Sequence, residues 1–239
     1  MSSGVLSVQD LYAGYGETTV LNGVSLEVPG GEIVALVGRN GAGKTTTLRC
    51  ITGSLPPAGG SISWRGEDIT GFAPMETARS GIGLVPEERR IFPGLTVEEN
   101  LRIAGYGSGE DDRGRSIDDV LEEFENLRER RTSLGHNLSG GEQQMLAVGR
   151  ALINGADILL LDESTEGLAP MIVQRVQELI RELNDDGLTV LMVEQNLAVV
   201  MEVADRIYIL DQGEIVYDGT PADLEERPEI RDRHLGVSV

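Results

Sequence analysis

The sequence predicts an α/β protein with a mostly parallel sheet core, an N-terminal antiparallel β subdomain and an inserted helical subdomain. Three observations indicate this fold class. Apolar and polar residues alternate near the N-terminus, β-branched runs alternate with helical patterns in the second half, and a charged helical stretch lies between them. We expect one domain over residues 1–239, with its core in 1–86 and 155–239 and the helical subdomain in 87–154.

The first elements are expected to be antiparallel strands. Residues 25–28 alternate between polar and apolar side chains, and the chain then turns at the Pro-Gly-Gly of residues 29–31. Ile33–Val37 is a nearly continuous β-branched run, which is typical of a strand buried on both faces. A second short hairpin is expected around residues 62–64.

The middle of the chain is expected to be helical and charged from about residue 86 to 154, with an interrupting loop at 105–115. Ser116 is placed as an N-cap, and apolar residues recur after it at helical spacing: Ile117, Val120, Leu121, Phe124 and Leu127. Beyond this insertion, the pattern predicts strands at 158–161, 188–193, 207–210 and 214–216, with an amphipathic helix at 170–183. This strand-helix-strand order indicates a mostly parallel core.

The composition is strongly acidic, with a formal net charge of −20 and a single lysine, Lys44. Affinity for nucleic acid or anionic lipid depends on Lys and Arg neutralising phosphates, so neither is expected as a direct general partner. The carboxylates form either an ordinary solvated surface or an adaptation to a high-salt, halophilic cytoplasm, where screening relieves their repulsion.

Several features predict a cytoplasmic location. No apolar stretch approaches the roughly 20 residues that cross a bilayer. Residues 1–7 lack the basic and apolar segments of a secretory signal. The lone cysteine, Cys50, cannot form an intrachain disulfide, which agrees with a reducing interior.

A phosphate-binding motif follows the strand at Ile33–Val37. Its pattern is G-x-x-x-x-G-K-[ST], and its residues are Gly38, Arg39, Asn40, Gly41, Ala42, Gly43, Lys44 and Thr45, with Thr46 opening the next helix. Glycines let successive N–H groups point at phosphate oxygens, and the helix N-terminus adds partial positive charge. Lys44 is expected to reach the β and γ phosphates of ATP, and Thr45 to bind Mg²⁺. A compact ammonium suits this position better than the planar guanidinium used elsewhere in the chain.

A pair of carboxylates ends the apolar strand at 158–161. Ligands collect at the carboxyl ends of parallel strands, so Asp162 and Glu163 are expected beside the phosphate-binding motif, which is called the P-loop below. We expect Asp162 to bind Mg²⁺ through its water shell, and Glu163 to orient or deprotonate the water that attacks the γ phosphate.

A third motif opens a helix upstream of this strand, with Ser139 as cap and Glu142 three residues later. The motif consists of Leu138, Ser139, Gly140, Gly141 and Glu142. With it, the sequence resembles the ABC ATPase family over essentially the whole chain. The resemblance implies that this signature covers ATP held by the P-loop of a partner subunit, so that the active form is a dimer. It also implies that Tyr15 stacks on the adenine.

Four phrases resemble one subgroup, the second ATP-binding subunit (LivF type) of branched-chain amino-acid importers: residues 85–87, 96–101, 167–170 and 193–196. The resemblance implies a homologous ATPase partner in a homodimer or heterodimer, transmembrane permease subunits and, indirectly, an external solute-binding protein. The expected location is the cytoplasmic face of the cell membrane.

Several positions depart from the general family pattern. Glu87 stands where most members have a glutamine that contacts Mg²⁺ and the attacking water, and a carboxylate there can still bind metal. Gln195 replaces a switch histidine, and an amide can donate a hydrogen bond but cannot shuttle a proton. Ser164 and Ala169 replace a proline and an aspartate in the loop that makes cross-dimer contacts in the family.

Three functions are compatible with these residues. The leading hypothesis is a transport ATPase. The alternatives are an ABC clamp that is not coupled to transport, and a regulatory subunit that binds ATP while its partner hydrolyses it. The first alternative usually has long coiled coils, tandem cassettes or basic surfaces, which are absent from the sequence. Glu163 argues against the second, whereas Glu87 and Gln195 leave it open.

Overall fold

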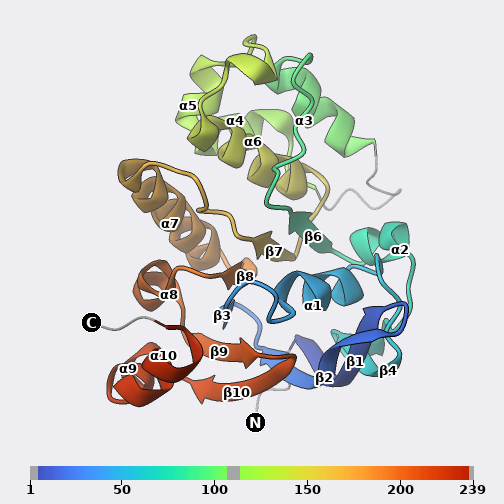
Figure 1. Cartoon of the computed structure of the whole chain (residues 1–239). Helices are drawn as coiled ribbons and strands as arrows, with labels where there is room; N and C mark the ends of the chain where they lie inside the picture. The colour runs from blue at the N-terminus through green and yellow to red at the C-terminus, as the bar shows by residue number, and fades with distance from the viewer. Residues whose placement is uncertain (1–4, 107–113, 237–239) are drawn as a thin grey trace.

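The computed structural model describes residues 5–106 and 114–236, so most of the loop predicted at 105–115 lies outside the described residues. Two sheets and a group of helices make up these parts (Figure 1). The first sheet has the order β2-β1-β4-β5 and consists of β1 (Leu6–Tyr15), β2 (Thr18–Val28), β4 (Gly59–Trp64) and β5 (Glu67–Asp68). All its strand pairs are antiparallel, as the alternating pattern predicted.

The second sheet has the order β10-β9-β3-β8-β7-β6. Its strands are β3 (Ile33–Val37), β6 (Ile82–Val85), β7 (Ile158–Asp162), β8 (Thr189–Glu194), β9 (Arg206–Asp211) and β10 (Glu214–Gly219). Every neighbouring pair is parallel except β9 and β10, the last two predicted strands, which form a hairpin at the edge. The mostly parallel core is therefore confirmed.

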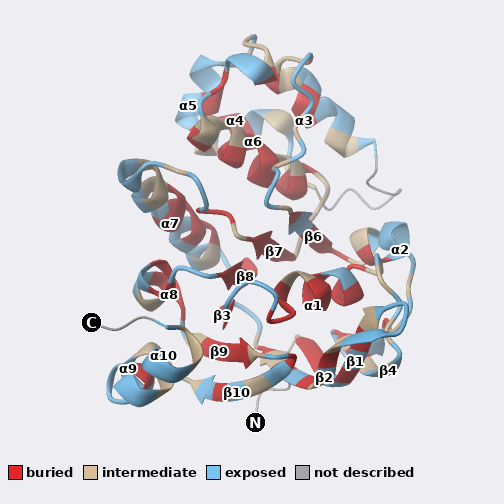
Figure 2. Ribbon diagram, in the orientation of Figure 1, coloured by how far each residue is buried: buried red, intermediate tan, exposed pale blue. Residues whose placement is uncertain are grey.

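Strand β3 shows why a continuous apolar run is needed at the centre of this sheet. All five of its residues are buried. Val34 and Leu36 join the cluster that contains α1 (Lys44–Ile51) and the first sheet. Ile33, Ala35 and Val37 join a second cluster with α6 (Gly140–Ile153), α7 (Pro170–Asp185) and α8 (Leu197–Val203). Figure 2 shows the buried central strands between these layers.

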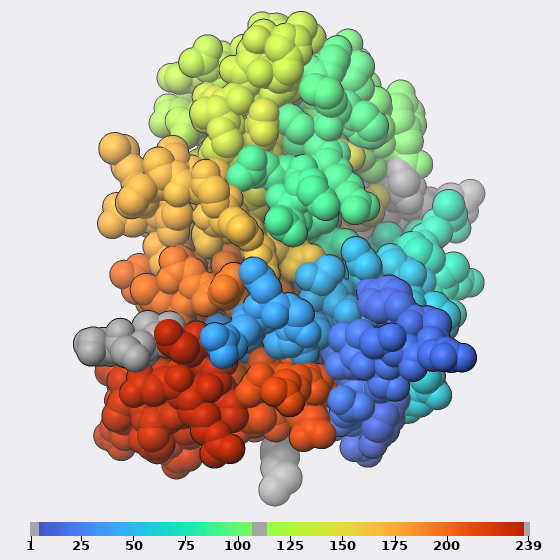
Figure 3. Space-filling model, viewed as in Figure 1, coloured from blue at the N-terminus to red at the C-terminus, as the bar shows by residue number. Residues whose placement is uncertain are grey.

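The helical subdomain is inserted between β6 and β7 and forms the upper end of the molecule in Figure 3. Its remaining elements are α3 (Val97–Gly105), α4 (Ile117–Glu123), α5 (Glu125–Glu129) and η1 (Gly135–Asn137). Ser116 caps α4 by accepting a hydrogen bond from the Asp119 N–H at 3.1 Å, as predicted.

The apolar spacing from residue 117 to 127 gives two helices instead of one continuous helix. The chain leaves helical geometry at Phe124, whose φ and ψ are −103° and 77°. Its ring is buried against α6, where a Cβ added at Gly149 would lie 3.9 Å from Phe124 Cε2. Packing of the ring onto α6 accounts for the break that helical periodicity alone did not reveal.

The other helices are α2 (Pro74–Arg79), α9 (Pro221–Glu225) and α10 (Pro228–His234). None of the helices in the described ranges is long and apolar enough to cross a membrane.

Candidate functional site

The phosphate-binding motif forms a tight loop between β3 and α1 whose course depends on glycine. A Cβ at Gly38 would lie 2.4 Å from the carbonyl oxygen of Leu210 in β9, so a larger residue would displace the loop. Gly41 and Gly43 have φ values of 82° and 115°, which glycine adopts most readily. Because Gly43 caps the helix, α1 begins at Lys44, two residues before the predicted start.

Lys44 lies under this loop with only 4% of its surface exposed. Its Nζ donates hydrogen bonds to the carbonyl oxygens of Gly38 at 2.9 Å and Arg39 at 3.3 Å. It also pairs with Glu163 Oε1 at 3.2 Å. The ammonium is therefore aimed at the inside of the loop, and the pair brings the two sequence-predicted residues together.

Thr45 and Asp162 form a second link between the P-loop and the end of β7. The Thr45 hydroxyl donates to Asp162 Oδ1 at 3.3 Å. Burial raises the pKa of Asp162, while the hydrogen bond from Thr45 and the charge of Lys44 oppose that shift. One hydroxyl and one carboxylate suit Mg²⁺, which usually takes few protein ligands and keeps several waters. No cluster of three or more metal-binding side chains occurs in the described ranges.

Glu163 has a left-handed backbone conformation, with φ of 46°. Its N–H donates to the carbonyl oxygen of Val193 in the neighbouring strand at 2.8 Å. A non-glycine residue in this conformation costs on the order of 1–3 kcal/mol and persists only where its surroundings hold it. A hydrogen bond to Glu163 raises the pKa of Glu166, and the charge of Glu163 adds to that shift.

Three other predicted residues are exposed around this core. Glu87 follows β6, and its negative charge contributes to raising the pKa of Asp162. Gln195 lies between β8 and α8. Tyr15 is 45% exposed at the end of β1, and its hydroxyl accepts a hydrogen bond from Arg49 Nη1 at 2.9 Å.

The remaining P-loop residues differ in their solvent exposure. Arg39, Asn40 and Gly41 are exposed, whereas Ala42 and Thr46 are buried against the core.

The signature residues cap α6. The Glu142 N–H donates to Ser139 Oγ at 3.3 Å, and the Ser139 N–H donates to Glu142 Oε2 at 2.7 Å. Glu142 also pairs with Arg130 at 3.5 Å. A Cβ at Gly141 would lie 2.5 Å from Ile172 of α7, so glycine is required for this close approach. Within the described ranges, no hydrogen bond or ion pair joins residues 138–142 to residues 38–46.

Sequence reasoning missed one buried carboxyl group beside Glu163. Glu194 ends β8, is 2% exposed and accepts hydrogen bonds from Ser164 and Thr165. Burial raises the pKa of Glu194 to about 7, against the effect of these hydrogen bonds. Its position directly before Gln195 was the only signal available in the sequence.

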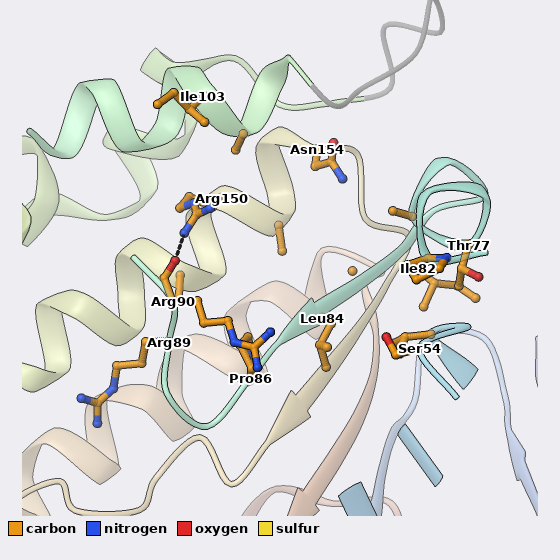
Figure 4. Close-up of a pocket in the computed structure, with 17 residues that line it drawn as sticks. Ser54, Thr77, Ile82, Leu84, Pro86, Arg89, Arg90, Ile103, Arg150 and Asn154 are labelled. Atoms are coloured by element: carbon orange, nitrogen blue, oxygen red, sulfur yellow. Dashed lines mark hydrogen bonds between the residues drawn. The ribbon is translucent and has the colours of Figure 1, made fainter. Parts of the chain in front are cut away.

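A groove of about 440 Å³ separates the helical subdomain from the core (Figure 4). Leu84 and Ile103 give it apolar surface. Arg150 Nη1 donates to the carbonyl oxygen of Arg90 at 2.6 Å, and its guanidinium lies 4.8 Å from the Phe92 ring centroid. None of the described residues lining this groove is acidic, although the chain carries 40 Asp and Glu residues.

Comparison with protein families gives a match to the ABC transporter family over residues 21–166. The chain belongs to this family. The predicted family is thus confirmed, and with it the ATP-binding character of an ABC transporter cassette.

Relatives of this ABC transporter subunit extend the match to nearly the whole chain. The high-affinity branched-chain amino acid transport ATP-binding protein BraG of Pseudomonas aeruginosa is 46% identical, covering 97% of this chain and 100% of that protein. The probable branched-chain amino acid transport ATP-binding protein LivF of Archaeoglobus fulgidus is 36% identical, covering 98% and 99%.

A solved ABC transporter ATP-binding cassette in its ADP conformation has a TM-score of 0.85 and 26% identity, covering 95% of this chain and 97% of that one. This likeness confirms the predicted fold class. A dimeric cassette bound to ADP and Pi gives a TM-score of 0.78 at 26% identity, covering 90% and 98%.

Proposed function

We propose that this chain is the ATP-hydrolysing subunit that energises an ABC importer for branched-chain amino acids. One observation carries the hydrolytic part: Lys44 contacts Glu163 while Thr45 contacts Asp162, so the phosphate, metal and water-activating groups share one edge of the sheet. The cargo is supported by full-length relatives that are named as branched-chain amino acid transport ATP-binding proteins.

The nucleotide would be held by several groups at once. Tyr15 stacks on adenine, residues 38–46 wrap the phosphates, and Thr45 and Asp162 bind Mg²⁺. When bound, Mg²⁺ neutralises charge on the β and γ phosphates. Lys44 exchanges Glu163 for phosphate oxygens, which releases the carboxylate to orient or deprotonate water.

Glu87 and Gln195 adjust this chemistry at the exposed rim of the site. Glu87 adds a carboxylate that can bind the metal, and Gln195 supplies an amide donor toward the γ phosphate. Because Gln195 cannot carry charge, Glu163 is left as the base. Slow turnover in this chain would favour the alternative of a regulatory subunit.

The signature is proposed to complete the site of a partner subunit. Ser139, Gly140 and Gly141 lie at the N-terminus of α6, which suits contact with a γ phosphate. The partner is a second copy or a homologous subunit. A dimeric relative with ADP and Pi bound supports this arrangement.

The groove beside Arg90 and Arg150 is the proposed contact for the permease subunits, which would place the chain at the cytoplasmic membrane face. Three arginines, Arg89, Arg90 and Arg150, line the groove without any acidic lining residue, which suits an acidic permease segment. Arg90→Glu should reduce co-purification with the permease while ATP hydrolysis by the isolated subunit persists. Arg128→Glu, at an exposed position of α5, is the control. An unchanged permease yield in Arg90→Glu would contradict this contact.

Steady-state ATP hydrolysis tests the proposed function. Glu163→Gln should lower kcat by about 100-fold or more while ATP binding persists and a stable dimer accumulates. Glu202→Gln, on α8, serves as a matched control and should behave as wild type. Unchanged turnover in Glu163→Gln would refute the role of Glu163 as base.

A further inference from the structure

One buried carboxylate oxygen accepts three hydrogen bonds from the loop that follows Glu163. Glu194 Oε1 accepts hydrogen bonds from Ser164 Oγ at 3.3 Å, from the Thr165 N–H at 3.3 Å and from Thr165 Oγ1 at 3.1 Å. Ser164 is 2% exposed and Thr165 is 7% exposed, so all three residues are buried. Unmade hydrogen bonds are costly in such surroundings. This convergence therefore fixes the loop against the end of β8.

Strand β8 also contacts Glu163 directly. The Glu163 N–H donates to the carbonyl oxygen of Val193, the residue before Glu194. Glu163 and the two residues after it are therefore all bonded to residues 193 and 194. These two attachments support its left-handed backbone conformation, which a non-glycine residue does not hold unaided.

Gln195 is the next residue along the chain from Glu194. It lines a cavity of about 560 Å³ together with Glu163, Thr165 and Glu194. A displacement of Glu194 would therefore change the placement of Gln195 relative to Glu163. Shifts of about 1 Å at reacting groups can cost on the order of 100-fold in rate.

We propose that Glu194 is a positioning residue for ATP hydrolysis. Through a single oxygen atom it fixes the loop after Glu163, and so it fixes the position of Glu163 relative to Gln195. This inference rests on the proposed ATPase function. Glu194 acts through Ser164 and Thr165, and the oxygen needs only to accept hydrogen bonds. Because the amide oxygen of glutamine is also an acceptor, Glu194→Gln keeps the required atom and Glu194→Ala removes it.

The test compares kcat, KM and ATP affinity in these two variants. Glu194→Ala should lower kcat by about 10- to 100-fold with KM and ATP affinity within about twofold of wild type, since the P-loop that is proposed to hold the phosphates is unchanged. Glu194→Gln should recover kcat to within about threefold of wild type. Glu202→Ala controls for removal of a carboxylate from the same cavity. Wild-type kcat in Glu194→Ala, or equal loss in both Glu194 variants, would overturn the proposal.

Removing the donors provides a second route if Glu194→Ala unfolds. The double variant Ser164→Ala/Thr165→Val should also lower kcat at unchanged KM; where Glu194→Ala folds, adding it to the double variant should cause little further loss. Fully additive losses would contradict a shared role. Failure of the proposed function has a different signature: the wild type hydrolyses no ATP, or Glu163→Gln retains full turnover.

Discussion

Residues 38–46 and residues 138–142 are both glycine-rich segments at helix N-termini, but different parts of the protein support them. In the first segment, the buried Lys44 contacts two backbone carbonyls and Glu163, which directly follows strand β7, more than a hundred residues away along the chain. In the second, exposed Ser139 exchanges hydrogen bonds with Glu142 of its own helix. The first segment is built into the core, whereas the second is presented outward by the helical subdomain.

This difference separates two roles that both concern ATP. The P-loop is proposed to bind phosphate within one chain. In the signature, Ser139 is exposed and exchanges its hydrogen bonds within its own helix, so its proposed contribution to ATP hydrolysis depends on a partner. Variants in the two segments should therefore affect binding and dimer-dependent hydrolysis separately.

Lys44→Ala should have the largest effect, lowering ATP affinity by about 100-fold or more because the phosphates lose their buried cation. Affinity is measured by titration of the isolated subunit with ATP. Arg79→Ala removes an exposed cation from α2 and should leave affinity unchanged. Retained affinity in Lys44→Ala would discredit the P-loop assignment and remove the basis of the comparison.

The stability of the folded protein should depend on pH through the buried carboxyl group of Glu194. Burial raises the pKa of Glu194 from its ordinary value of 4.5 to about 7, so the folded protein binds this proton more tightly than the unfolded chain. The contribution of Glu194 to stability is then full below pH 4.5 and is lost as pH rises to about 7. Glu194→Gln removes this dependence.

In urea unfolding, the stability of Glu194→Gln relative to wild type should increase between pH 5 and pH 8, by on the order of 2 kcal/mol. Parallel pH profiles for the two proteins would contradict the buried titration. The signature variants below should not change the profile, because Ser139 is exposed and does not ionise in this range.

Ser139→Ala should leave ATP affinity within about twofold but lower dimer-dependent hydrolysis about tenfold or more, since one donor to the phosphate is lost. The lost cap should also reduce stability by about 1 kcal/mol. Thr96→Ala is a matched control, because Thr96 caps α3 in the same way by accepting from the Glu99 N–H at 3.2 Å. Equal loss of hydrolysis in both variants would indicate that Ser139 acts only as a helix cap.

Added salt should weaken the buried ion pair of the site least and the exposed ion pairs of the surface more. The Lys44–Glu163 pair is shielded, whereas pairs such as Arg206–Asp218 are about 40% exposed. Under the high-salt hypothesis, multimolar KCl should raise the thermal midpoint by about 5 °C or more by screening the net charge of −20. A salt-independent midpoint would reject that hypothesis, which neither the structure nor the relatives above test.

The parts predictable from sequence are those whose signals are contiguous. Ile33–Val37 is a strand with the predicted bounds, and the P-loop follows it directly. Asp162 and Glu163 could be placed beside the P-loop because parallel strands deliver their ends to one edge. The break at Phe124 and the bonds between Glu194 and Ser164 depend on contacts between distant segments, which periodicity does not report. The site roles assigned to individual residues stay predictions.

The single lysine makes the nucleotide site chemically distinguishable from the rest of the protein. Any lysine-selective label or isotopic methyl group on an ε-amine reports on Lys44 alone. Because that amine is 4% exposed and paired with Glu163, its labelling rate and its NMR signal measure how often the loop opens. Slower labelling of this amine when ATP is added would therefore report nucleotide binding without the introduction of a reporter residue.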